Sequence, residues 1–182
     1  MTDTQKKPLW KNELVWLFLL TSGLFAILYS KFILGGYAYV FTDTGADTMQ
    51  INYAQYGLFS SLFRSGESGY VLQAGLGMDV SSYYPAYLIP YNLLILLAPQ
   101  RLLPWAVLAS AYLKMITISL VGYLFYRKLM QDGIGTMAAA LAWTFSGYVI
   151  LWGQHYGFCT CMALFTVSVS YTHLTLPTNS RV

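Results

Sequence analysis

Long apolar runs alternate with short polar segments along this chain. Residues 14–34 form the first run, and a helix of that length extends roughly 30 Å at about 1.5 Å per residue, enough to cross a bilayer core. Two similar runs follow the polar middle of the chain. The predicted membrane-spanning helices are residues 14–34, 105–126 and 136–152. The pattern therefore predicts an all-α fold in a polytopic transmembrane protein.

The polar middle, residues 35–104, is predicted to be an external loop that carries helices of its own. Residues 49–64 have the pattern of an amphipathic helix, with Tyr56, Phe59 and Phe63 on one face. Such a helix can lie flat on a membrane surface. Residues 85–99 are apolar but short, so they are either a re-entrant or interfacial helix or a tilted span.

Positive charges indicate the orientation of the chain. Residues 1–13 contain three lysines, and the predicted loop 127–135 contains Arg127 and Lys128. Both segments face the cytoplasm if residues 85–99 do not cross the membrane. If they do cross, Arg101 faces the cytoplasm and the Arg127–Lys128 pair is exported. Because cytoplasmic loops are enriched in Lys and Arg, we expect the first arrangement, with a cytoplasmic N-terminus.

The last part of the chain departs from the apolar pattern. Residues 153–168 are predicted to be an external turn and the start of a further span. Residues 169–182 then become polar within that span. We expect this tail to be a read-through product that is not native to the protein, so that the chain is truncated.

Composition agrees with a membrane location and excludes a soluble domain. Charged residues make up 9% of the chain, against about 25% in soluble domains, while 57% of its residues are hydrophobic. The 16 tyrosines and 5 tryptophans are typical of a protein with aromatic side chains at the membrane interfaces. The net charge of +3, without a long basic cluster, argues against nucleic acid as a partner.

Two of the few acids, Asp43 and Asp47, lie in the polar segment after the first predicted span. A carboxylate outside the membrane can act as a general base or bind a divalent cation beside a phosphate. Asp47 also has the position of a helix N-cap, with Gln50 three residues later. Both interpretations stay open. Lys114, inside a predicted span, either faces a functional cavity or pairs with another helix.

A series of short motifs resembles the N-terminal part of YfhO-type bacterial membrane proteins, which belong to the GT-C glycosyltransferase superfamily. The resemblance covers roughly residues 10–167. The motifs are Asp47-x-x-Gln50 followed by Tyr53 or Tyr56, the Gly75–Gly77 turn, Tyr83-Tyr84, the run from Pro90 to Leu94, and the run from Phe145 to Tyr148. The family has many more spans than this chain.

The resemblance implies transfer of a sugar from a polyprenyl-phosphate donor to an acceptor outside the cell membrane, such as teichoic acid or another cell-envelope polymer. It implies that Asp47 is the catalytic acid, with Asp43 as the second candidate. Gln50, Tyr53 and Tyr56 are expected to bind substrate, as is His155 in the second external turn. A divalent cation, Mg²⁺ or Mn²⁺, is a candidate cofactor, with Asp47 as its candidate ligand.

The bilayer, the lipid-linked sugar and the polymer acceptor are thus the expected partners, and the bacterial cell membrane is the expected location. We expect the truncated chain to be inactive by itself, because the missing spans complete the site in this family. Two other functions are compatible with the same residues. The protein could be a transporter or flippase for a lipid-linked saccharide, or a membrane assembly subunit without catalysis.

Overall fold

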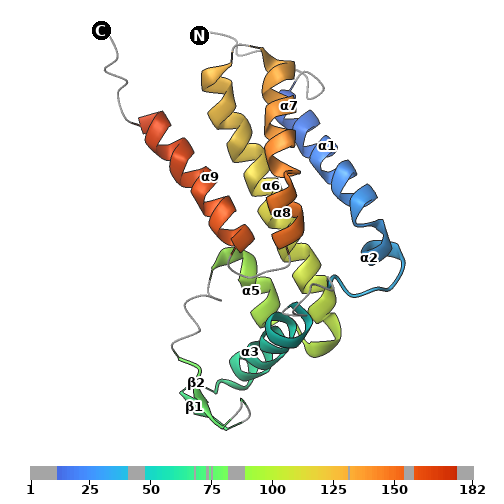
Figure 1. Ribbon diagram of the computed structural model, residues 1–182, viewed down its shortest axis with the longest axis vertical. Coiled ribbons are helices and arrows are strands. Elements are labelled where there is room, and N and C mark those ends of the chain that lie inside the picture. The colour runs from blue at the N-terminus through green and yellow to red at the C-terminus, as the bar shows by residue number, and fades with distance from the viewer. Residues whose placement is uncertain are drawn as a thin grey trace, which may run out of the picture.

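The computed structural model describes residues 12–40, 48–67, 69–72, 74, 76–81, 89–130, 132–153 and 158–175. These residues are mainly helical, which confirms the all-α prediction. The elements, labelled in Figure 1, are α1 (Glu13–Leu28), α2 (Ser30–Leu34), the π-helix η2 (Thr48–Tyr53), α3 (Ala54–Ser65), β1 (Tyr70–Val71), β2 (Met78–Asp79), α5 (Pro90–Leu97), the 3₁₀-helix η3 (Gln100–Leu102), α6 (Leu103–Leu129), α7 (Gly133–Thr144), α8 (Gly147–Trp152) and α9 (Phe158–Thr175).

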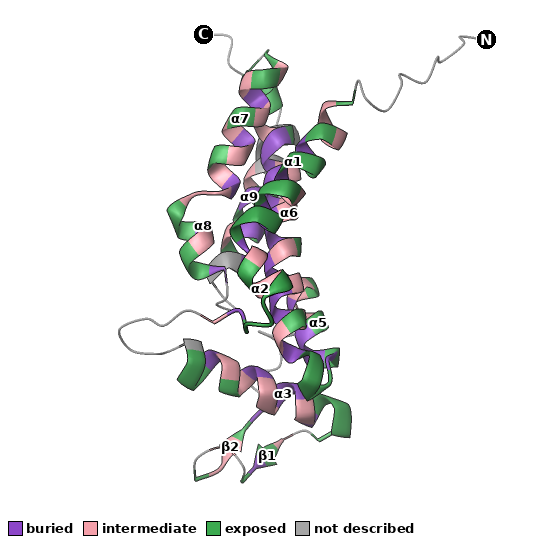
Figure 2. Ribbon diagram, turned by 90° about the vertical axis from the view of Figure 1, so that its right-hand side faces the viewer, coloured by how far each residue is buried: buried purple, intermediate pink, exposed green. Residues whose placement is uncertain are grey.

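Helix α6 is the centre of a helical bundle. It packs against α1, α5, α7 and α9, and Figure 1 shows α1, α7 and α9 running along its length. At one end of the bundle, α3 lies across the helix axes, and the small antiparallel hairpin β1–β2 lies beyond it (Figure 2). We call this end, made of η2, α3, the hairpin and α5, the cap. The turn between α6 and α7 lies at the opposite end.

One helical segment in the described part of the chain is long and apolar enough to cross a membrane, namely Gln100–Leu129. The apolar helices Glu13–Leu28 and Thr160–Val169 are shorter. This composition supports association with a membrane. Lys114 lies within α6 and is 1% exposed, so its side chain is directed into the bundle and not toward the surrounding solvent or lipid.

Two predicted helices are interrupted in the structure. The segment 14–34 divides into α1 and α2 at Tyr29, whose ring stacks on Phe25 with the ring centroids 4.3 Å apart. The segment 136–152 divides into α7 and α8, because Ser146 has an extended backbone with ψ of 151°. Apolar residues continue on both sides of each interruption, so hydrophobicity alone did not reveal them.

The predicted amphipathic helix 49–64 is η2 followed by α3, and it packs on protein. Tyr56 and Phe59 are buried in the core, whereas Phe63 remains 37% exposed. Two hydrogen bonds attach α3 to the chain around α5. The Ser60 hydroxyl donates to the Ala98 carbonyl at 2.5 Å, and the Gln100 amide donates to the Gly57 carbonyl at 2.6 Å. The cap is therefore anchored to the bundle.

The described part of the segment 85–99 contains only the short helix α5. Its 8 residues extend about 12 Å, well below the ~30 Å of a hydrocarbon core. Pro90 begins the helix, and α5 packs between α3 and α6. This length favours the interfacial or re-entrant alternative over a separate span.

Candidate functional site

Three of the expected site residues, Asp43, Asp47 and His155, lie outside the described residues. The structure does describe the chain next to them. The acidic segment, residues 41–47, is joined at one end to Val40 and at the other to Thr48, where η2 begins. His155 follows the end of α8 at Gly153. These described neighbours define the surroundings of the candidate site.

A groove lies between the start of the cap helices and the β-hairpin, with a volume of about 610 Å³. We call it the hairpin groove. Gln50 and Gln55 line it on the helical side, and Leu76 and Met78 line it from the hairpin. Carboxamide groups can both donate and accept hydrogen bonds, and the apolar side chains offer a flat contact surface. This combination suits a polar, hydroxyl-rich ligand such as a saccharide.

A second hollow, of about 270 Å³, lies between α2, the stretch after it and the beginning of α6. We call it the Arg101 pocket, because Arg101 is the charged residue that lines it. Tyr37 and Tyr39 contribute from the stretch after α2, and Trp105 and Leu108 contribute from α6. Aromatic rings around a guanidinium suit a ligand that carries both an anion and apolar surface.

The acidic segment connects these two hollows along the chain. Residues 36–39 line the Arg101 pocket, and Gln50 and Ile51 line the hairpin groove. Residues 41–47 are the chain between them. Asp43 and Asp47 belong to this connecting segment and lie outside the described residues. The chain thus passes from a pocket lined by a cation to an amide-lined groove through a segment that contains two acids.

A contact between Tyr39 and Gly153 joins the stretch after α2 to the end of α8. Its side chain is 1% exposed, and a Cβ atom built on Gly153 would lie 2.7 Å from its hydroxyl oxygen. The stretch that leads into the acidic segment therefore contacts the end of α8. His155 lies two residues beyond that contact in the chain.

The two tyrosines expected to bind substrate have different positions. Tyr56 is 1% exposed and packs in the core beneath the cap, and its expected role in substrate binding stays a prediction. Tyr53 is partly buried, and its ring meets that of Tyr56 at a centroid distance of 6.3 Å. Tyr53 follows Gln50 by three residues on η2, and Gln50 lines the hairpin groove.

The hydroxyl of Tyr53 is buried and has no hydrogen-bond partner among the described residues. Burial raises the pKa of Tyr53 to about 12. The phenol therefore keeps its proton at neutral pH, because desolvation disfavours the phenolate. A buried hydroxyl of this kind can donate a hydrogen bond to a ligand, but it is a poor candidate for a general base.

No metal site is formed within the described ranges, where no three His, Cys, Asp or Glu side chains come together. Asp47, the candidate metal ligand, and Asp43 are outside those ranges. The exposed Asp79 on β2 accepts hydrogen bonds from the hydroxyl and backbone N–H of Ser81, at 2.7 and 3.0 Å. These bonds lower the pKa of Asp79. They stabilise the turn that follows β2, and neither residue lines either hollow.

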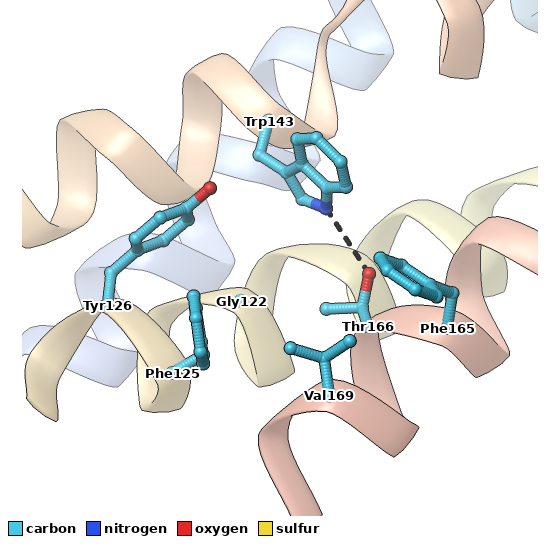
Figure 3. Close-up of a pocket in the computed structure, with 7 residues that line it drawn as sticks. All are labelled: Gly122, Phe125, Tyr126, Trp143, Phe165, Thr166 and Val169. Atoms are coloured by element: carbon cyan, nitrogen blue, oxygen red, sulfur yellow. Dashed lines mark hydrogen bonds between the residues drawn. The ribbon is translucent and has the colours of Figure 1, made fainter. Parts of the chain in front are cut away.

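A smaller apolar pocket of about 120 Å³ lies between α6, α7 and α9 (Figure 3). Gly122 lines it together with the aromatic rings of Phe125, Trp143 and Phe165. The Trp143 indole N–H donates to the Thr166 hydroxyl at 3.2 Å, as the dashed line in Figure 3 shows. The described residues that line this pocket are uncharged.

Sequence reasoning missed Arg101, Tyr37 and Trp105 as site residues. One signal was present, since Arg101 and Trp105 stand directly before the longest apolar helix, where cationic and aromatic side chains mark a membrane interface. Their meeting with Tyr37 depends on contacts between distant parts of the chain.

Comparison of the chain with known protein families, with curated proteins and with solved structures found no match to any of them.

Proposed function

We propose that this chain forms part of a membrane glycosyltransferase of the GT-C type, which transfers a sugar from a polyprenyl-phosphate donor to an acceptor outside the cytoplasm. A cell-envelope polymer such as teichoic acid is the proposed acceptor. One observation carries the proposal: the acidic segment 41–47 joins a pocket lined by Arg101 to a groove lined by Gln50 and Gln55. A glycosyl transfer site needs a carboxylate between a phosphate and a saccharide.

In this proposal α1, α6, the α7–α8 pair and α9 cross the membrane as a bundle. The basic pair Arg127 and Lys128 ends α6, at the opposite end from the cap. Because positive residues are retained in the cytoplasm, that end is cytoplasmic and the cap is outside. The acidic segment is then on the side where polyprenyl-linked sugars are used. The proposed protein is multi-pass, with its N-terminus in the cytoplasm.

The proposed reaction is a direct displacement at the anomeric carbon of the donor. An acceptor hydroxyl oxygen forms the new bond to this carbon, while the bond between the carbon and the phosphate oxygen breaks. The phosphate leaves with the bonding electron pair, and a carboxylate takes the proton of the acceptor hydroxyl. Asp47 is the proposed base or, with Mg²⁺ or Mn²⁺ bound, a ligand that neutralises the phosphate. Asp43 is the alternative carboxylate.

Gln50 and Tyr53 have supporting roles in this scheme. The exposed amide of Gln50 lines the hairpin groove and is proposed to bind a saccharide hydroxyl. The protonated hydroxyl of Tyr53 is proposed to donate a hydrogen bond to the same ligand. His155 is retained as a substrate-binding candidate, because the contact between Tyr39 and Gly153 ties its segment to the acidic one.

The test is replacement of the acids in the whole glycosyltransferase of which we propose this chain to be a part, produced in bacterial membranes. Asp47→Asn preserves size but removes the base, and general-base catalysis contributes about 10²–10⁴-fold. We expect at least a 100-fold loss of transfer of labelled sugar from a synthetic prenyl phosphate to polymer. Asp79→Asn is the matched control, because Asp79 is an acid of the cap that lines neither hollow.

The amount of each variant in the membrane is measured alongside activity. Normal transfer by both Asp47→Asn and the double variant with Asp43→Asn would reject the proposal. Movement of the lipid-linked sugar across vesicles without any transfer would identify a transporter.

A further inference from the structure

The Arg101 pocket holds a cation that no described residue neutralises. The guanidinium of Arg101 makes no hydrogen bond or ion pair with any described residue, and the pocket around it is otherwise lined by aromatic, apolar and backbone groups. The guanidinium of arginine carries a positive charge. Its planar fork of N–H donors matches the oxygens of a phosphate.

The side chains around the pocket have the composition of a membrane interface. Trp105 and Tyr37 are 48% and 68% exposed, and both line the pocket. Tryptophan and tyrosine concentrate at the depth of lipid headgroups. Trp105 stands four residues after Arg101, at the beginning of the apolar helix α6. In the proposed membrane orientation, the guanidinium is therefore at headgroup depth.

Two exposed leucines are close in the chain to residues that line the pocket. Leu34 ends α2 and is 85% exposed, and Leu102 directly follows Arg101 and is 53% exposed. Exposed leucines beside a cationic pocket fit a ligand with a hydrocarbon chain. The pocket volume of about 270 Å³ is below the ~300–1,000 Å³ of sites that enclose drug-sized molecules. It has room for a headgroup, with the chain left outside.

We infer that the Arg101 pocket binds the phosphate of a membrane lipid, with the guanidinium on the phosphate oxygens and the lipid chain along Leu34 and Leu102. This inference rests on the membrane orientation in the proposed function but not on sugar transfer. Tyr37 and Tyr39 line the pocket and lead directly into the acidic segment. A lipid phosphate bound there is lined by the residues that precede the acidic segment in the chain.

The test measures lipid retention by the purified protein in detergent, using native mass spectrometry. Separate samples receive a short prenyl phosphate, phosphatidylglycerol, phosphatidylcholine or inorganic phosphate. We expect retention of the two anionic lipids, and at least a 10-fold loss of it in Arg101→Gln. Arg101→Lys keeps the charge but not the bidentate geometry, so an intermediate loss is expected.

Arg64→Gln is the matched control, because Arg64 is an exposed arginine of the cap that lines neither hollow. Prenyl phosphate retained above phosphatidylglycerol would identify the pocket as a carrier-lipid site, and equal retention would identify a site for bulk anionic lipid. Both outcomes support a lipid phosphate. Equal lipid retention by the wild type, Arg101→Gln and Arg64→Gln would overturn the inference, as would inorganic phosphate displacing the lipids at equal concentration.

Failure of this inference is distinguishable from failure of the proposed function. Asp47→Asn is expected to retain the lipid while losing sugar transfer. If Asp47→Asn transfers sugar normally but Arg101→Gln loses lipid, the result supports the lipid site and rejects the catalytic role of Asp47.

Discussion

The hydroxyl of Tyr39 lies against Gly153, so closely that a Cβ atom added there would be 2.7 Å from the oxygen. The two residues come from different polar segments, one leading into the acidic segment and the other ending α8. Gly153 has helical backbone angles, φ of −57° and ψ of −32°, so its lack of a side chain matters for space and not for backbone conformation. This contact holds the two polar segments together at the cap end of the bundle.

Gly153→Ala is expected to destabilise the protein by about 1–3 kcal/mol, the usual cost of forcing an extra carbon into a packed site. The measurement is unfolding of the detergent-solubilised protein by a denaturing detergent. Combining it with Tyr39→Phe, which removes the crowded oxygen, should recover part of the loss. Gly147→Ala is the control, because a Cβ there meets no atom within 4 Å. Equal stability of the two alanine variants would contradict the contact.

A hydrogen bond between Thr21 and Ser119 joins α1 to α6. The two hydroxyl oxygens are 2.8 Å apart, and both side chains are 0% exposed. Thr21→Val and Ser119→Ala should each destabilise the protein by about 1–2 kcal/mol, because each leaves one buried hydroxyl unpaired. The double variant should cost less than the sum of the two, by at least about 0.5 kcal/mol.

Thr117→Val is the matched control for this pair. Its hydroxyl bonds to the Leu113 carbonyl within α6 and is exposed, so we expect little change in stability. Strictly additive losses from Thr21→Val and Ser119→Ala, in the same detergent unfolding measurement, would show that the two hydroxyls do not interact.

The buried phenol of Tyr53 makes stability depend on alkaline pH. Its pKa is raised from 10.0 to about 12, so the unfolded chain loses the phenolic proton at lower pH than the folded one. Ionisation therefore stabilises the unfolded state first. The free energy of unfolding falls as the pH rises from 10, until the folded phenol also ionises near pH 12. Tyr53→Phe should remove this part of the fall.

The measurement is the free energy of unfolding of the wild type and of Tyr53→Phe across that alkaline range. All the other titrating groups are the same in the two proteins. Tyr70→Phe is the control, because Tyr70 is 66% exposed on the hairpin and its hydroxyl donates to the Leu76 carbonyl. A pH dependence unchanged in Tyr53→Phe would mean that its hydroxyl is not buried.

Hydrophobic patterning predicted the helical class and the approximate extent of the central helix well. Residues 105–126 were expected to be helical, and α6 covers them from Leu103 to Leu129. The interruptions at Tyr29 and Ser146 were not predicted. The backbone leaves the helical region at Tyr29, with φ of −100° and ψ of 15°, and is extended at Ser146.

The candidate site was predicted only in part. Gln50 faces an open groove, but Tyr56, spaced six residues later, turns into the core. The helical pattern predicted a packing role for Tyr56, and the resemblance implied a binding role. The structure buries this side chain where α3 packs on α5. The groove itself needs the hairpin, whose two short strands have too few residues to show a periodic signal.

By itself, the sequence determined the all-α class and the position of the longest apolar helix. It also determined how far apart along the chain the acids and the Arg127–Lys128 pair are. Each of these depends on residue type and local spacing. Only the tertiary structure decided that Tyr37 and Arg101 share a pocket and that Tyr39 contacts Gly153. These partners are far apart in the chain. Their meeting is set by how α2, α6 and α8 pack together, and a local hydrophobic period carries no information about that packing.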